Sequence, residues 1–224
     1  MTVLFVVATI ILFLTADWIV RKVRAREKAA VGAVPYQLNK VTYPLRLPEG
    51  VFFARSHTWL NLFPSGKVQI GVDDFIARLL EHPEIVLLKK QGDRINKGEA
   101  VLELREQKNI LTVCSPIEGE VLAVNEELVT KPQLLKESLF SEGWGYMMKP
   151  ARLSDLKQLL LGSETKTWIR NEFQRLKDVF ASFNKNGNME PAFLQDGGQP
   201  VTGALKMMDP AVWSCIQKEF LELQ

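Results

Sequence analysis

Three patterns of hydrophobic and polar residues follow one another along the chain, and each predicts a different kind of structure. Residues 3–20 form an unbroken apolar run. As a helix, about 18 residues span about 27 Å, close to the hydrocarbon thickness of a bilayer. Short β-rich runs separated by glycine-containing turns occupy the middle of the chain, and apolar positions spaced by threes and fours then predict helices towards the C-terminus.

The apolar run predicts an uncleaved membrane anchor rather than a cleaved signal peptide. A signal peptide carries basic residues before its apolar core and small residues at its exit. Here the order is reversed, because Met1 and Thr2 are uncharged and basic residues follow the run, at Arg21, Lys22, Arg24, Arg26 and Lys28. We therefore expect 1–28 to be a single-pass anchor with its basic flank, inserted in the lipid bilayer of the inner (cytoplasmic) membrane through residues 3–20. The positive-inside rule puts the soluble domain in the cytoplasm.

A proline-containing linker is expected over 29–48. The short β-rich runs that follow it predict an antiparallel sandwich or small barrel. Trp59 and Trp144 are interpreted as aromatic anchors of its core. Turns with positive φ are expected at four glycines, Gly71, Gly92, Gly98 and Gly119. The predicted strands cover 51–54, 58–63, 67–71, 85–89, 100–105, 111–114 and 119–124.

Helical patterns appear once inside the β-rich region and again after it. A short helix over 73–80 is capped by Asp73 and Asp74, and 154–183 reads as two helices broken at Gly162. After the β-rich domain we expect a helix over 163–183, a flexible connector over 184–208 and a C-terminal helix over 209–224. The apolar stripe of the last helix either packs on the parent domain or docks a partner, and it comprises Val212, Ile216, Phe220 and Leu223.

Composition narrows the function. The chain has 224 residues with 28 Lys and Arg against 26 Asp and Glu, so it lacks the basic excess of nucleic-acid-binding proteins. Its two cysteines, Cys114 and Cys215, are far apart and indicate neither a disulfide framework nor a metal site. His57 has no nucleophile or carboxylate partner set by sequence and is interpreted as structural, and His82 as part of a surface loop. No catalytic signature is present, so the chain is not expected to be an enzyme.

Ordered motifs in the central region identify a family. They are Ser56-His57-Thr58-Trp59, Ile70-Gly71-Val72-Asp73-Asp74-Phe75, Ser115-Pro116-Ile117-Glu118-Gly119-Glu120-Val121 with Val124-Asn125, Lys131-Pro132-Gln133-Leu134, and Glu142-Gly143-Trp144. Residues 49–162 thereby resemble the H protein of the glycine cleavage system, a lipoyl carrier. The resemblance implies a mainly β fold of the barrel-sandwich hybrid (lipoyl-domain-like) type, here with one N-terminal transmembrane helix and C-terminal helices added.

Whether the chain carries a lipoyl group depends on one lysine. In H proteins a Glu-Ser-Val-Lys-Ala hairpin presents the lipoylated lysine seven residues before the serine of Ser-Pro. Lys108 keeps that spacing to Ser115, so the resemblance makes it the candidate lipoyl attachment site. Its neighbours differ from the family pattern, since Arg105 replaces the glutamate, and Glu106 and Asn109 replace the small residues.

Two functions follow from these observations. The altered neighbours of Lys108 favour a non-catalytic docking or assembly module without a cofactor, whose protein partners belong to a membrane-associated complex. The alternative is a carrier in which lipoate on Lys108 shuttles intermediates or reducing equivalents between partner enzymes. The sequence does not identify the complex, the oligomeric state or the role of the C-terminal extension.

Overall fold

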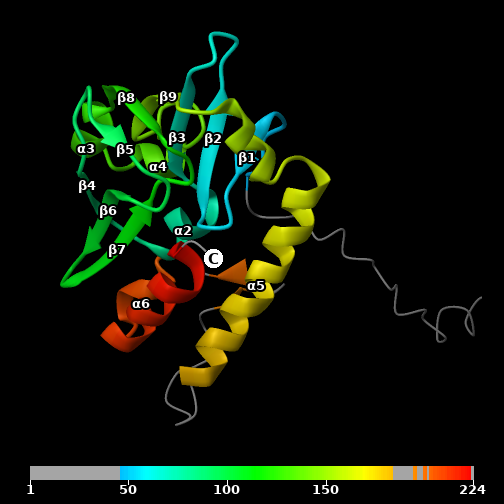
Figure 1. Cartoon of the computed structure of the whole chain (residues 1–224). Coiled ribbons are helices and arrows are strands. Elements are labelled where there is room, and N and C mark those ends of the chain that lie inside the picture. The colour runs from blue at the N-terminus through cyan, green and yellow to red at the C-terminus, as the bar shows by residue number, and fades with distance from the viewer. Residues whose placement is uncertain (1–45, 184–193, 196–198, 201, 223–224) are drawn as a thin grey trace, which may run out of the picture. The chain divides into compact units, whose positions relative to one another are not determined.

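The computed structural model describes residues 46–183, 194–195, 199–200 and 202–222 (Figure 1). The predicted anchor over 3–20 and its basic flank lie outside this part of the chain. Within the described ranges, no helix combines the length and apolar character that crossing a bilayer requires.

Two antiparallel sheets form the centre of the domain, which confirms the prediction of a mainly β sandwich. The large sheet has the strand order β1-β2-β3-β9-β8-β5, and the small sheet has the order β4-β6-β7. The strands of the large sheet are β1 Val51–Phe53, β2 Thr58–Leu62, β3 Val68–Val72, β9 Tyr146–Pro150, β8 Gly119–Val124 and β5 Arg94–Ile95. Those of the small sheet are β4 Glu84–Leu87, β6 Ala100–Glu106 and β7 Asn109–Cys114.

The seven predicted strands are all present, although their ends shift by one or two residues. Two strands of the large sheet, β5 and β9, were not predicted, and β9 is internal to the sheet, between β3 and β8. Its sequence, Tyr-Met-Met-Lys-Pro, lacks the β-branched residues on which strand recognition depends. The structure also pairs β10 Leu194–Gln195 with β11 Gln199–Pro200.

Tyr146, at the start of β9, links the two sheets. Its hydroxyl donates a hydrogen bond to the carbonyl of Val101 on β6 and accepts one from the amide of Lys89, at 2.7 and 3.0 Å. Burial raises the pKa of Tyr146 to about 12, so the phenol keeps its proton and remains a donor at neutral pH.

The two predicted tryptophan anchors differ. Trp59 is fully buried, as expected, but the prediction for Trp144 is wrong because its side chain is only half-buried. Its backbone carbonyl accepts a hydrogen bond from the side chain of Asn125. Two positions later on the same segment, Tyr146 takes the buried aromatic position.

The four glycines divide into two kinds. Gly92 and Gly98 have the expected positive φ, at +89° and +85°. Gly71 and Gly119 do not, so that expectation is wrong for them. They are needed for close approach, because a Cβ atom on Gly71 would lie 2.6 Å from the ring of Trp59 and one on Gly119 would lie 2.6 Å from the carbonyl oxygen of Lys149.

The helices lie between and after the strands along the chain. The short predicted helix is α2 Asp74–Leu79, and the side chain of Asp73 caps it by accepting from the amides of Phe75 and Ile76. The predicted break at Gly162 is confirmed, since the residue has a φ of +62° between the two helices on either side of it. The other helices are α3 Glu126–Thr130, α4 Leu134–Glu137, η1 Leu153–Gln158 and α5 Ser163–Phe183.

The C-terminal helices pack on the β domain. Residues that the sequence assigns to a connector form η3 Ala204–Met207 instead, with Leu205 fully buried. The last predicted helix is α6 Pro210–Ile216, which continues as the π-helical turn η4 Gln217–Leu221. Val212, Ile216 and Phe220 of the predicted stripe are buried, and α6 and η4 lie against β7 (Figure 1).

Candidate functional site

Lys108 lies at the tip of the hairpin that joins β6 to β7. The hairpin has a two-residue loop, Gln107 and Lys108, closed by the pairing of Glu106 with Asn109. Gln107 has a φ of +56°, as expected at the first loop position of a type II′ turn. Lys108 is exposed, and its amine makes no hydrogen bond or ion pair with another described residue. The turn therefore presents a free amine to solvent.

Glu106, two positions before Lys108, is turned into the protein. Its side chain is 7% exposed, and its carboxylate accepts hydrogen bonds from the backbone amides of Glu81 and His82, with shortest distances of 3.1 and 2.7 Å. A carboxylate that accepts backbone amides in this way acts as a structural tie between two loops. The replacement of the family's small residue by Glu106 therefore does not leave a free carboxylate beside the lysine.

Arg105, the other charged replacement, is paired on its own strand. Its guanidinium donates to the carboxylate of Glu103, with the shorter contact at 2.6 Å. The two residues lie on one face of β6, because side chains two apart in a strand point to the same side. A half-exposed pair of this kind neutralises the local charge without covering Lys108.

A second cluster surrounds His57, whose imidazole is 0% exposed. Its Nδ1 lies 2.7 Å from a carboxylate oxygen of Asp73, and its Nε2 lies 3.7 Å from one of Glu172, which is within ion-pair range but beyond a direct hydrogen bond. The ring stacks on Phe75 at 4.4 Å. The sequence missed both carboxylate partners, although the Asp-Asp helix cap was a signal for one of them.

The two carboxylates make the buried histidine a cation. Burial alone would lower the pKa of His57, but the charge and hydrogen bond of Asp73, with the nearby charge of Glu172, raise it to about 8. Burial would raise the pKa of Glu172, but His57 and Arg175 hold it below its ordinary value. A ring sealed from solvent cannot touch a substrate in this conformation, so we assign His57 a structural role that ties α5 to the β domain.

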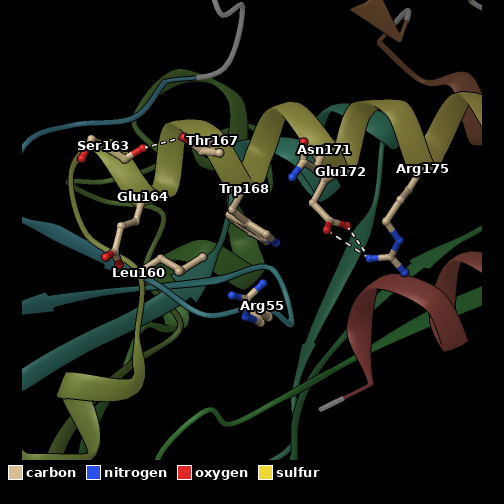
Figure 2. Close-up of a pocket in the computed structure, with 9 residues that line it drawn as sticks. All are labelled: Arg55, Leu160, Ser163, Glu164, Thr167, Trp168, Asn171, Glu172 and Arg175. Atoms are coloured by element: carbon tan, nitrogen blue, oxygen red, sulfur yellow. Dashed lines mark hydrogen bonds and ion pairs between the residues drawn. The ribbon is translucent and has the colours of Figure 1, made fainter.

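A groove of about 850 Å³ runs along α5, next to the His57 cluster (Figure 2). Trp168 and Glu172 line it, Arg175 pairs with Glu172, and Arg55 lies across from the helix. Lys108 is not among its lining residues. Across the described ranges, no group of three or more His, Cys, Asp and Glu side chains is arranged to hold a metal ion.

Comparisons with known proteins agree on one family. The family model described as Glycine cleavage H-protein matches residues 51–172. A probable glycine cleavage system H protein of Thermococcus gammatolerans is 33% identical over 116 residues, which cover 51% of this chain and 86% of the relative. The glycine cleavage system H protein of Chromobacterium violaceum is 36% identical over 114 residues, covering 51% of this chain and 89% of the relative.

One similar solved structure is the crystal structure of a glycine cleavage system H protein from Mycobacterium marinum. It is 22% identical, covers 53% of this chain and 94% of that chain, and has a TM-score of 0.44. The family match ends within α5, so η3, α6 and η4 lie outside it.

Proposed function

Because the chain belongs to the glycine cleavage H-protein family, we propose that it is a lipoyl carrier with Lys108 as its attachment site. The comparisons favour this carrier function over the docking or assembly module that the altered neighbours of Lys108 suggest. Members of the family are carriers rather than catalysts, and they interact with the partner enzymes of the glycine cleavage system. By the same proposal, this chain contributes no catalytic residue of its own.

The observation that carries the proposal is the setting of Lys108. The lysine is at the tip of a tight two-residue turn, exposed, with no partner for its amine among the described residues. Glu106 is occupied by backbone amides and Arg105 by Glu103. The residues that depart from the family pattern thus leave the lysine accessible, so the departure does not argue against modification.

The attachment reaction requires only an accessible lysine amine from this protein. A lipoyl group activated as its adenylate by a ligase and ATP would react with Nζ of Lys108, forming the amide bond as AMP leaves and the amine loses a proton. When bound, the group supplies a dithiolane that carries intermediates and electrons between active sites. The residues of the hairpin hold the point of attachment, and the partner enzymes supply the catalysis.

Mass spectrometry of the protein purified from its own organism tests the proposal. We expect a lipoyl mass increment on the peptide that contains Lys108, and its loss in Lys108→Arg. Lys67→Arg is the matched control, since Lys67 is also exposed beside a hairpin turn, between β2 and β3. A native protein without any increment, isolated from cells that lipoylate their other acceptors, would overturn the carrier function.

We also propose that residues 3–20 tether the carrier to the inner membrane, with the soluble domain on the cytoplasmic side. The support is the apolar run and the basic residues that follow it. A tether would restrict the carrier to partner enzymes at the membrane surface, where the shared location raises their effective concentration.

A further inference from the structure

The C-terminal extension touches the hairpin of Lys108 through Gln217. Gln217 is the first residue of η4, and its side-chain amide makes two hydrogen bonds with the backbone of Thr112 on β7. Its oxygen accepts from the amide of Thr112 at 2.7 Å, and its nitrogen donates to the carbonyl of the same residue at 3.0 Å.

These two bonds imitate strand pairing. β7 is an edge strand of the small sheet, so its outward backbone groups have no neighbouring strand in the part of the chain that the structure describes. A glutamine amide has the donor and acceptor of a peptide group and can take the place of one residue of a missing strand. Thr112 is four positions after Lys108, and the contact therefore fixes the strand that leads away from the lysine.

A second contact fixes the strand that leads towards the lysine. Glu106 at the end of β6 is held by the amides of Glu81 and His82. The side chain of Glu81 is in turn paired with Lys206 of η3, at 2.5 Å. Both strands of the hairpin are thus connected to the C-terminal extension, one directly and one through the loop after α2.

The extension is itself well anchored, as an element that positions another must be. Trp213 and Phe220 are buried, and the indole nitrogen of Trp213 donates to the carbonyl of Leu205 at 3.0 Å. Arg175 on α5 holds the carbonyl of Glu219 at 2.7 Å and its carboxylate at 3.1 Å. The segment over 204–221 therefore joins the hairpin to the buried part of the domain.

We propose that the segment over 204–221 is a clamp that positions the Lys108 hairpin for acyl transfer, with Gln217 and Lys206 as its positioning residues. The inference rests on the proposed function, because it assigns the clamp a role in modification of Lys108. A short hairpin at a sheet edge frays, and an enzyme that recognises the ordered turn binds only the ordered fraction. The clamp raises that fraction before the enzyme arrives.

Gln217→Leu in the full-length chain in detergent tests the clamp, since leucine removes both hydrogen bonds at nearly the same size. Gln174→Ala is the control, because Gln174 is an exposed residue of α5 that donates a hydrogen bond to Asp178 on its own helix. Amide hydrogen exchange at Leu111, which pairs with Leu104 across the hairpin, should become about tenfold faster in Gln217→Leu and stay unchanged in the control.

The second measurement is the rate at which a lipoate–protein ligase, with lipoate and ATP, modifies each variant. If the clamp sets the ordered fraction, Gln217→Leu should raise KM for the acceptor protein at unchanged kcat, by at most the factor by which exchange becomes faster. Lys206→Met should act in the same direction, and Lys206→Arg should restore the wild-type KM because arginine can still pair with Glu81. Global unfolding would also raise KM at unchanged kcat, so the free energy of unfolding of each variant is measured as well, and the clamp requires a KM change in variants that remain fully folded.

The two measurements separate the possible failures. Unchanged exchange at Leu111 in Gln217→Leu would overturn the clamp, whether or not the lysine is modified. Faster exchange with an unchanged KM would overturn its role in positioning. A wild-type protein that is never modified would refute the proposed function and the positioning role with it, whereas the exchange result would still decide whether the clamp orders the hairpin.

Discussion

Raising the pH should weaken the attachment of the C-terminal helices by removing the proton of His57. The imidazole lies between Asp73 on the β domain and Glu172 on α5, so its charge joins the two. Aromatic rings of Phe75, Trp168 and Phe220 pack around it and exclude water. Deprotonation would remove the cation that Asp73 and Glu172 share and leave Glu172 paired with Arg175 alone.

The magnitude follows from the pKa. The folded protein raises the pKa of His57 from 6.5 to about 8, and each pKa unit corresponds to about 1.36 kcal/mol. Because the folded value is the higher one, the stabilisation is fully present below pH 6.5 and is lost as the pH rises through 8. We expect the free energy of unfolding to fall by about 2 kcal/mol from this group between about pH 6 and pH 9.

Denaturant unfolding of the full chain over this pH range measures the effect. His57→Asn is the reference, because asparagine tolerates the positive φ of +56° at this position and does not titrate. The wild-type free energy of unfolding should fall with pH more steeply than that of the variant, by about 2 kcal/mol over the range.

Ring titration by NMR gives the same answer without unfolding. The chain has only two histidines, and His82, which is highly exposed, is assigned with His82→Asn. The pKa of His57 should fall in Glu172→Gln, since one of the two carboxylates is then neutral. A His57 ring that titrates below 6.5 in the wild type, or equal pH slopes in the wild type and His57→Asn, would refute this account.

Two further predictions concern the core and the membrane. Trp59→Ala should cost about 3–5 kcal/mol by denaturant unfolding, while the half-buried Trp144→Ala should cost about 1–2 kcal/mol, and equal costs would contradict the burial assigned to them. Ser65→Cys, in a chain with Cys114→Ser and Cys215→Ser, should react with an impermeant thiol reagent only after cell lysis. Labelling in intact cells would show that the proposed topology is wrong. Recovery of the protein in the soluble fraction would show that the proposed tether is wrong. Burial raises the pKa of both native thiols, which makes them slow to react but does not replace their removal.

Local sequence patterns predicted much of the fold because features such as helix caps and breaks depend only on neighbouring residues. The Asp73 cap and the break at Gly162 depend on neighbours within a few residues, and both are where the sequence placed them. The choice between Trp144 and Tyr146 as the buried aromatic depends on which of them meets the other sheet. No pattern within the strand decides that.

The candidate site was predicted in position but not in its surroundings. The spacing to Ser115 located Lys108 at a hairpin tip, and the structure places it there. The sequence could not show that Glu106 turns inward, because its partners are backbone amides about 25 residues earlier in the chain. It also could not join His57 to Glu172, which lie on segments brought together only by the packing of α5.

The cap that Gln217 places on Thr112 also affects how the protein behaves in a crowded cell. An edge strand with open backbone groups is a template for pairing with other chains, and proteins that leave such edges uncovered tend to aggregate. By occupying part of the β7 edge, the C-terminal segment protects the sheet from self-association. A shortened chain that ends after α5 would expose this edge. We expect such a chain to lose solubility, although it would still contain the attachment site at Lys108.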